Sequence, residues 1–276
     1  MSNLLQDQVA IITGAGRGIG AAAAHLFAAQ GARVVVSDRD AEPTAAVVES
    51  ITAAGGRALG IPGDVTDPDF PAALMAKTHE AFGAVHILVN NAGYTWDGML
   101  HKMSDKQWEA MLTVHNTAPF RLVRAAAPYM RDAAREEQAA GAPLAPRCII
   151  NVSSTSGLHG NIGQLNYATA KMGMVGFTKT VAKEWGAFGI RCNAVAFGYI
   201  ETRLTQAKES GETIAVDGEE IPLGVPSHLH EMVKMLIPLG RTGTVEEAAG
   251  AILLLASPFA GYINGHTLEV TGGMGI

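Results

Sequence analysis

Tyr167 and Lys171 are the residues whose types and spacing point most directly to chemistry. Residues four positions apart share one face of a helix, so the phenol and the amine are expected to be neighbours. A tyrosine titrates at about pH 10, and a neighbouring ammonium group is expected to lower the pKa of Tyr167 toward neutral pH. Ser154 ends a predicted strand, and its hydroxyl can hold a carbonyl oxygen beside the tyrosine. Because the Y-x-x-x-K spacing occurs by chance in many helices, its reading as an acid–base pair depends on what accompanies it.

A glycine-rich segment near the start of the chain is typical of phosphate binding. The apolar run Val9–Thr13 predicts a strand, and it leads into Gly14, Gly16, Gly18 and Gly20 and then into a helical pattern. Glycines let the backbone turn tightly and approach a pyrophosphate, whose charge the helix N-terminus favours. The spacing is G-x-x-x-G-x-G rather than the commoner G-x-G-x-x-G, and the four glycines partly satisfy either template. We therefore predict a dinucleotide site here.

Asp38 follows the second predicted strand, where an acidic side chain can accept both ribose hydroxyls of a dinucleotide. The same carboxylate would repel a 2′-phosphate by about 4 kcal/mol at roughly 4 Å and an effective dielectric constant near 20. Arg17 and Arg39 oppose this effect, since either side chain can pair with such a phosphate. The alternative is that Asp38 is an ordinary turn residue. We expect NAD as the preferred cofactor, with NADP not excluded.

The elements that position these residues alternate regularly along the chain. Buried strands are predicted at 9–13, 33–37, 58–61, 85–90, 148–153, 190–196 and 266–270, and helices at 18–30, 43–54, 68–82, 104–134, 166–188 and 245–255. Continuous apolar strands separated by helices predict an α/β fold with a parallel sheet covered on both faces. Right-handed crossovers make this a doubly wound sheet of the Rossmann type. We expect a single catalytic domain over 1–276, with a substrate loop or lid at about 199–238.

Composition narrows the class of protein and its partners. The chain has 276 residues, 48% of them hydrophobic, and a net charge of −6, which argues against a nucleic-acid or anionic-membrane partner. No signal peptide and no membrane span is recognised, so a cytoplasmic location is expected. Cys148 and Cys192 lie in apolar runs and are expected to be buried free thiols. His228 and His230 lack further ligands at a convincing spacing, so no metal site is predicted.

The motifs occur in one order, and in this the chain resembles the short-chain dehydrogenase/reductase family over essentially its whole length. The matching pieces are residues 13–20, Asp38, Asp64-Val65, Asn90-Asn91-Ala92-Gly93, Ser154, Tyr167 with Lys171, and residues 198–202. The resemblance implies reversible hydride transfer between a nicotinamide and a carbonyl or secondary alcohol. It also implies a homotetramer or homodimer acting on a small-molecule substrate.

The same resemblance implies a role for each site residue. Tyr167 would be the general acid and base, Lys171 would bind the nicotinamide ribose and tune Tyr167, and Ser154 would orient the substrate. Asp64 and Val65 would meet the adenine, Asn90 would line the cofactor, and Ile200 and Thr202 would approach the nicotinamide carboxamide. The expected cofactor-binding set is Gly14, Arg17, Gly18, Ile19, Gly20, Asp38, Asp64, Val65, Asn91, Ala92, Gly93, Tyr167, Lys171, Ile200 and Thr202.

Two positions depart from the family pattern. Where the family usually has an asparagine that holds a proton-relaying water, this chain has His115, with Asn116 one residue later. One residue is about 100° around a helix, so Asn116 should point elsewhere unless the helix is locally distorted. A histidine can donate and accept protons near neutral pH, so His115 is a candidate for the relay, the alternative being a packed core histidine. Phe197-Gly198 also replaces the usual proline-glycine, which would change the cofactor-facing wall.

The substrate is less well defined by the sequence. Residues 90–100 resemble those of 3-oxoacyl-(acyl-carrier-protein) reductases, which favours a 3-oxoacyl ketone or 3-hydroxyacyl alcohol as substrate. Biosynthetic reductases of that group generally take NADPH, so Asp38 hints at oxidation instead. The alternatives are an NAD-dependent dehydrogenase of another secondary alcohol (a steroid, a polyol or a small alcohol) and a non-catalytic dinucleotide-binding sensor or assembly subunit.

Overall fold

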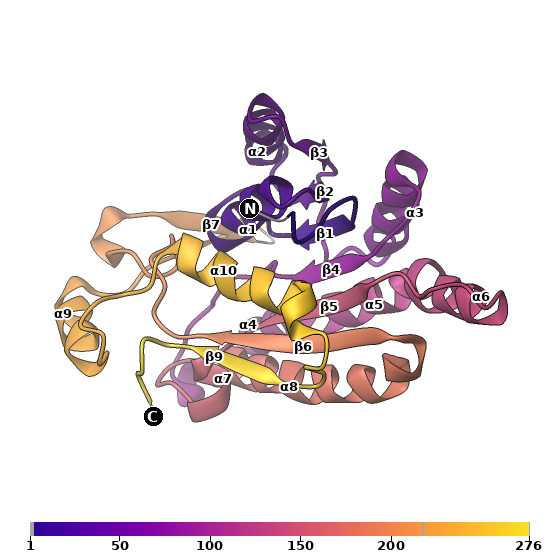
Figure 1. Cartoon of the computed structure of the whole chain (residues 1–276). Helices are drawn as coiled ribbons and strands as arrows, with labels where there is room; N and C mark the ends of the chain where they lie inside the picture. Colours follow the sequence, from indigo (N-terminus) through magenta and orange to yellow (C-terminus); the bar gives the residue numbers. More distant parts are fainter. Residues whose placement is uncertain (1–2, 217, 276) are drawn as a thin grey trace.

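Seven parallel strands form one central sheet in the computed structural model, which describes residues 3–216 and 218–275, the side chains of 228–231 excepted (Figure 1). In spatial order the strands are β3 (Arg57–Gly60), β2 (Arg33–Ser37), β1 (Val9–Thr13), β4 (Ile87–Asn90), β5 (Arg147–Ser154), β6 (Ile190–Phe197) and β9 (Thr267–Val270). Every neighbouring pair is parallel. The α/β, Rossmann-type doubly wound class predicted from the sequence is therefore confirmed, with strand bounds shifted by at most two residues.

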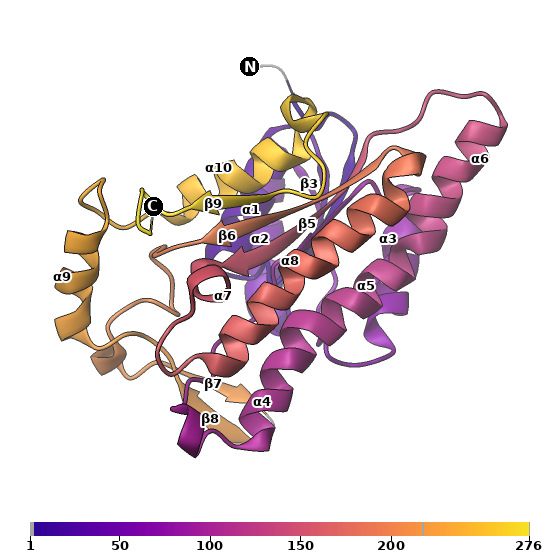
Figure 2. The same cartoon turned by 90° about the horizontal axis from the view of Figure 1, so that it is seen from below.

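Helices cover both faces of this sheet (Figure 2). One layer holds α1 (Gly18–Ala29), α2 (Ala41–Ala53) and α10 (Val245–Ala256), and the other holds α3 (Phe70–Phe82), α4 (Asp105–Leu112), α5 (Ala118–Ala127) and α8 (Leu165–Trp185). In the described part of the chain, no helix has both the length and the apolar character that crossing a membrane requires.

The alternation of side chains along each strand explains why both faces are apolar. Ala10 and Ile12 of β1 belong to the hydrophobic core under α1 and α10, whereas Ile11 between them belongs to the core under α3, α5 and α8. The same alternation continues in β2 and β4. A strand that needs apolar residues on both faces becomes a continuous apolar run, which is the pattern that identified these strands in the sequence. Cys148 and Cys192 are buried free thiols within these cores, as expected.

The order of connections creates a switch point at the centre of the sheet. From β1 the chain moves outward to β2 and β3, and from β4 it moves the other way to β5, β6 and β9. In open parallel sheets the crevice at the carboxyl ends of the strands beside such a point is where ligands bind. The loops that follow β1, β2, β4, β5 and β6 all open at this edge, and they contain most of the predicted site residues.

The helix predicted over 104–134 differs from the observed one. Two π-helical turns, Thr113–Thr117 and Pro128–Asp132, separate α4, α5 and α6 (Ala133–Ala139). A π-turn widens the helix by one residue and changes which side chains face a neighbour, and such turns are frequent at functional sites. A capping box in which Ser104 and Gln107 satisfy each other's backbone fixes the start of α4. Hydrophobic periodicity does not reveal such turns, because the helix continues through them.

The segment predicted as a loop or lid contains regular structure. Strands β7 (Thr213–Val216) and β8 (Glu219–Pro222) pair as an antiparallel hairpin, and α9 (Ser227–Leu236) follows. The short helix α7 (Thr155–His159), which the sequence analysis did not predict, begins directly after β5. Both additions lie near the carboxyl edge of the sheet, where they flank the site.

Candidate active site

The turn after β1 is shaped to admit a phosphate-bearing ligand. Gly14 and Gly18 have φ of +63° and +55°, a conformation that side-chain-bearing residues rarely adopt. A Cβ on Gly20 would lie 2.2 Å from the Gly14 carbonyl oxygen and 2.6 Å from Asn91 Nδ2, so only glycine fits there. Asn91 fastens the turn from the side, because its Nδ2 donates to the carbonyl oxygens of Thr13 (2.9 Å) and Gly14 (3.0 Å). The residues present therefore fit a dinucleotide pyrophosphate.

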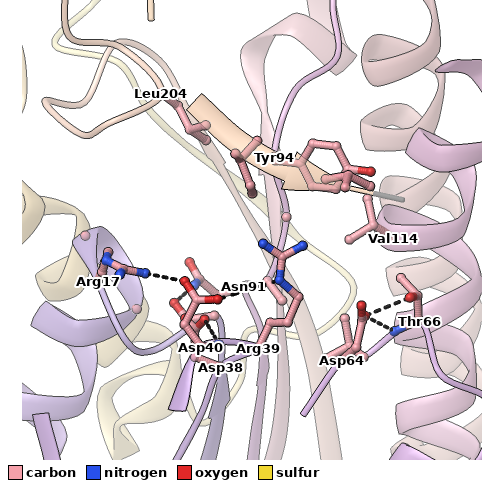
Figure 3. Close-up of a pocket in the computed structure, with 18 of the residues that line it drawn as sticks. Arg17, Asp38, Arg39, Asp40, Asp64, Thr66, Asn91, Tyr94, Val114 and Leu204 are labelled. Carbon is pink, nitrogen blue, oxygen red and sulfur yellow. Dashed lines mark hydrogen bonds and ion pairs between the residues drawn. The ribbon is translucent and has the colours of Figure 1, made fainter. Parts of the chain in front are cut away.

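A cavity of about 520 Å³ opens beside this turn, a volume within the usual range of small-molecule sites (Figure 3). Twelve of the predicted cofactor residues line it: Gly14, Arg17, Gly18, Ile19, Gly20, Asp38, Asp64, Val65, Asn91, Ala92, Gly93 and Thr202. They come from the loops after β1, β2, β3, β4 and β6, which are far apart in the sequence. The structure thus brings most of the predicted set together around one cavity.

Asp38 is held by the backbone at the end of β2. Its Oδ2 accepts a hydrogen bond from the Gly16 amide at 2.9 Å, and its Oδ1 accepts one from the Asp40 amide at 3.2 Å. Each carboxylate oxygen has further lone pairs, so the group can still accept hydrogen bonds from a ligand hydroxyl. The contact with Gly16 sets the distance between the carboxylate and the glycine turn.

Asp40 is a cavity-lining residue that the sequence analysis did not single out. Its Oδ2 pairs with Arg17 Nη1 at 2.7 Å, and its Oδ1 lies 3.7 Å from Arg39 Nε (Figure 3). Arg39 also donates from Nη1 to the Ala215 carbonyl oxygen of β7 at 2.8 Å, which joins the hairpin to the loop after β2. The alternating charges of Asp38, Arg39 and Asp40 were the available sequence clue, but spacing alone does not tell which arginine each acid meets.

The catalytic candidates meet at the carboxyl end of β5. Ser154 is the last residue of β5 and the N-cap of α7, and its hydroxyl forms a hydrogen bond with the Tyr167 phenol. Tyr167 lies in the first turn of α8, one turn before Lys171. Lys171 Nζ donates to the Val152 carbonyl oxygen at 2.8 Å and lies 5.5 Å from the centre of the Tyr167 ring. The structure thus places the three predicted groups side by side.

Burial, rather than the lysine charge, dominates the titration of this pair. Loss of water around the phenol raises the pKa of Tyr167 to about 12, although the hydrogen bond with Ser154 works in the opposite direction. Burial also lowers the pKa of Lys171 to about 7. Burial of both groups therefore outweighs any lowering of the Tyr167 pKa by Lys171 in the protein without dinucleotide, and the tuning of Tyr167 by Lys171 stays a prediction.

Asn166 holds the start of α8 against the opposite wall, a role that the sequence did not reveal. Its Nδ2 donates to the carbonyl oxygens of Trp96 and Gln107, both at 3.0 Å, and its Oδ1 accepts from the Tyr167 amide at 2.8 Å. The side chain is fully buried, and both donor hydrogens and the acceptor are used. Asn166 thereby fixes Tyr167 relative to the loop after β4.

His115 lies in the first π-helical turn, between the cavity and Tyr167. Its ring meets the Tyr167 ring edge-on, with ring centres 5.1 Å apart, and a Cβ on Gly93 would lie 2.2 Å from its Cε1. Its Nε2 is 2.8 Å from the Tyr94 carbonyl oxygen, which can only accept, so Nε2 holds the proton. Nδ1 is then an acceptor, and it is buried with no hydrogen-bond partner among the described residues.

Burial and the nearby Lys171 hold the pKa of His115 well below its usual range, so the ring is neutral. The local distortion considered for Asn116 is present, because the π-turn includes it. Asn116 Nδ2 donates to the Ala170 carbonyl oxygen at 2.9 Å, next to Lys171. The side chains of His115 and Asn116 therefore both reach the part of α8 that contains Tyr167 and Lys171.

Three of the fifteen predicted cofactor residues, Tyr167, Lys171 and Ile200, do not line this cavity, and the expectations for Asn90 and Phe197 also differ from the structure. Ile200 does not line the cavity, because it is buried in the core and its side chain packs toward Gly243. Asn90 also points inward, where its Nδ2 donates to Asn151 Oδ1 at 2.8 Å. The Phe197 side chain is buried in the core below α10, so its replacement of proline does not alter the cavity wall.

The sequence predicts no metal site, and the structure bears on this prediction only through the described residues. The described residues contain no group of three or more potential metal ligands. The side chains of His228 and His230 lie outside the described part, so the absence of a metal stays a prediction.

Comparison with known proteins gives an independent view of the same residues. A family model described as short chain dehydrogenase matches residues 8–213. The chain is 40% identical over 268 residues, 97% of this chain and 94% of the other, to a Streptomyces niveus protein named short-chain reductase protein NovJ. It is 39% identical over 272 residues to a 3-oxoacyl-[acyl-carrier-protein] reductase of Synechocystis, and 36% identical over 269 residues to the reductase FabG of Escherichia coli, with 98% of each chain covered in both cases. The matched range includes the glycine turn and all three catalytic candidates.

Proposed function

This chain belongs to the short-chain dehydrogenase/reductase family, and from that premise we propose that it interconverts a carbonyl and a secondary alcohol with Tyr167 as the general acid and base. As a member of this family it is an oxidoreductase that acts on CH–OH groups with NAD or NADP as acceptor. The observation that supports the proposed mechanism most directly is the contact of Ser154, Tyr167 and Lys171 beside the dinucleotide cavity.

Each catalytic candidate has a task that its geometry allows. The Tyr167 phenol donates its proton to the carbonyl oxygen during reduction, and its phenolate form accepts the hydroxyl proton during oxidation. Ser154 donates a hydrogen bond to the same oxygen and so sets its distance from Tyr167. Lys171 binds the ribose next to the nicotinamide and, when protonated, stabilises the phenolate form. The nicotinamide, when bound, supplies or accepts the hydride.

His115 is proposed to take part in proton transfer as an acceptor rather than as a titrating acid. Its proton is engaged by the Tyr94 carbonyl oxygen, and its pKa is lowered, so the ring does not become charged near neutral pH. The unpartnered Nδ1 can accept a hydrogen bond from a water that receives the proton leaving Lys171. The alternative, a packed core histidine, leaves this buried acceptor unexplained.

We propose NAD as the preferred cofactor. The residues that would hold it are those around the cavity, with the pyrophosphate at the glycine turn and the adenosine ribose at Asp38. In support, Asp38 is fixed by backbone amides, and the two arginines able to attract a 2′-phosphate both have an acidic neighbour. A direct test measures the affinities for NADH and NADPH, which should favour NADH in the unaltered protein and become level or reversed in Asp38→Ala.

The proposed substrate is a 3-oxoacyl ketone or the corresponding 3-hydroxyacyl alcohol. The names of several relatives at 36–39% identity, all 3-oxoacyl-[acyl-carrier-protein] reductases, support this class. Initial rates should be measured on an acetoacetyl thioester and on a panel of steroid, polyol and small alcohols, each with NAD(H) and NADP(H). Activity on an alcohol of the panel and none on the thioester with either cofactor would assign the chain to another secondary-alcohol substrate. Dinucleotide binding without turnover of any compound would favour the non-catalytic alternative.

The proposal also covers the substrate loop, the oligomeric state and the cellular location. Residues 199–238 are proposed to act as the substrate loop of a single catalytic domain. A homodimer or homotetramer is supported by exposed apolar side chains on α5 and α8, namely Phe120, Leu165 and Met172. Light scattering of the purified protein tests the assembly, and cell fractionation tests the proposed cytoplasmic location.

A further inference from the structure

We propose that Asp40 is a second determinant of the cofactor preference. It lowers the affinity for NADP because it pairs with the arginines that a 2′-phosphate would need. The inference rests on the proposed function, because it concerns the same dinucleotide site. Asp38 acts on a 2′-phosphate by direct repulsion. Asp40 acts through Arg17 and Arg39, by keeping their guanidinium groups occupied.

The contacts of Asp40 support this role. Both of its oxygens face arginines, with Oδ2 at 2.7 Å from Arg17 Nη1 and Oδ1 at 3.7 Å from Arg39 Nε. All three side chains line the cavity (Figure 3). Arg39 is held a second time by the Ala215 carbonyl oxygen. A 2′-phosphate would have to compete with an existing carboxylate for each arginine.

The position of Asp40 at the start of α2 is a second, independent observation. Asp40 is the N-cap residue of α2, a position where an aspartate usually accepts a hydrogen bond from an amide of the first turn. Here the side chain makes no capping bond. Its carboxylate is turned toward the arginines, and the Arg17 guanidinium holds the pKa of Asp40 below its usual value, so the group is charged at neutral pH.

The surrounding charges make the two acids interdependent. A third cavity-lining arginine, Arg203, pairs with Glu212 at 3.0 Å, so each of the three guanidinium groups has an acidic partner. Removing Asp38 alone removes the repulsion but leaves Arg17 and Arg39 with Asp40. Removing Asp40 alone frees the arginines but leaves the repulsion. The gain in NADPH affinity should therefore be larger for the double variant than the product of the two single gains.

The experiment is a double-mutant cycle read by calorimetric binding of NADH and NADPH. We expect Asp40→Asn to tighten NADPH binding by about tenfold and to change NADH binding by less than about twofold, as loss of one screened charge near the ligand predicts. Combined with Asp38→Ala, it should tighten NADPH binding by more than the product of the single effects. Asparagine is also a good N-cap residue, so α2 is preserved.

Controls separate pairing with arginine from a general change in charge. Asp132→Asn removes the same charge from a pair with Arg131 (2.7 Å) that does not line the cavity. If Asp40→Asn shifts the ratio of NADPH to NADH affinity no more than Asp132→Asn does, the proposal is wrong. Arg17→Ala in the Asp40→Asn background should remove most of the gain, and full retention of the gain would also overturn the proposal.

Two further measurements use Asp40→Ser, which provides another uncharged N-cap residue, and the unaltered protein. Asp40→Ser should reproduce the effect of Asp40→Asn, and an effect seen with only one of them would contradict a role of the charge. Tighter binding of NADPH than of NADH by the unaltered protein would refute the proposed NAD preference. The role of Asp40 is decided separately, by the change in the affinity ratio between variants.

Discussion

The dinucleotide end of the cavity and the proposed substrate loop, residues 199–238, are built in different ways. At the dinucleotide end, the turn after β1 depends on glycines with positive φ and on close backbone approaches that leave no room for a Cβ. The proposed substrate loop includes a hairpin that also lines the cavity, through Ile214 and Val216. Side chains join it to the rest of the site, as in the contacts of Arg39 with Ala215 and of Lys106 with Glu219. The first end depends on backbone geometry, and the second depends on side chains.

This difference determines how each end should respond to mutation. A backbone requirement leaves few acceptable residues at each position, so a single methyl group can disrupt the site. Contacts between exposed side chains are replaceable, and each contributes little. Tyr167, the proposed proton-transfer residue, should be the most sensitive position, because no other kind of side chain replaces its phenol in that role.

The largest effect is expected for Tyr167→Phe. The substitution removes the proton donor and acceptor but retains the ring, so kcat should fall by about 10³-fold or more, while the Kd for NADH stays within about twofold. Steady-state rates and calorimetry measure the two quantities. Tyr262→Phe, at a fully exposed tyrosine, is the matched control and should leave both unchanged. Turnover by Tyr167→Phe at the rate of the unaltered protein would refute the mechanism.

The second-largest effect is expected for Gly20→Ala, which changes the glycine turn after β1. In Gly20→Ala the new Cβ would lie 2.2 Å from the Gly14 carbonyl oxygen, so the turn must shift and lose its hydrogen bonds from Asn91. We expect NADH binding to weaken by about 100-fold, since misplacing a positioned group by about 1 Å has effects of that order. Gly176→Ala in α8, where a Cβ meets nothing within 4 Å, is the control and should retain binding. Equal affinities in the two variants would show that the turn is more adaptable than its geometry indicates.

The third prediction concerns His115, which lies between Gly93 of the cavity wall and Tyr167. His115→Phe keeps a ring of similar volume but has no acceptor, so kcat should fall by about 10–100-fold if Nδ1 serves the proton path. His115→Asn restores a polar side chain and should recover most of the loss. A similar melting temperature in both variants excludes a packing defect. Equal kcat values for the phenylalanine and asparagine variants would favour the packed core histidine.

The pH dependence of stability tests the burial of Lys171. Its folded-state pKa of about 7 lies below the usual value of 10.5, so between these pH values the unfolded chain binds a proton that the folded chain does not. The free energy of unfolding should therefore rise from pH 7 to pH 8.5, by at most about 1.4 kcal/mol per pH unit from this group. Urea titrations of the protein without dinucleotide measure it. Lys171→Met should lack this rise, and an identical pH profile in both proteins would contradict the shift.

The sequence predicted the parts of the structure that depend on local rules. Strands buried on both faces are continuous apolar runs, and the glycine turn needs particular residues, so the fold class and the set around the cavity were accessible. Asp40 was missed, since its arginine partner lies 23 positions earlier and its capping position normally has another use. The π-turn at His115 and the lowered pKa of Lys171 result from packing and burial, which a single sequence does not record. The same limit applies to Ile200, whose buried side chain packs close to Gly243, a residue far along the sequence.

The smallest effect is expected where the hairpin meets α4. Glu219 forms an exposed ion pair with Lys106, with about half of each side chain accessible to solvent, and such pairs contribute about 0–1 kcal/mol. Glu219→Gln should therefore change the Kd for NADH by less than about threefold, and the difference should disappear at high salt. Lys106→Gln should have the same small effect, and the double variant should add nothing, because both single variants remove the same interaction. A loss of more than about tenfold in any of them would mean that this exposed ion pair is required to hold the hairpin against the dinucleotide cavity, which Ile214 and Val216 line. The division between a backbone-built end and a side-chain-built end would then have to be abandoned.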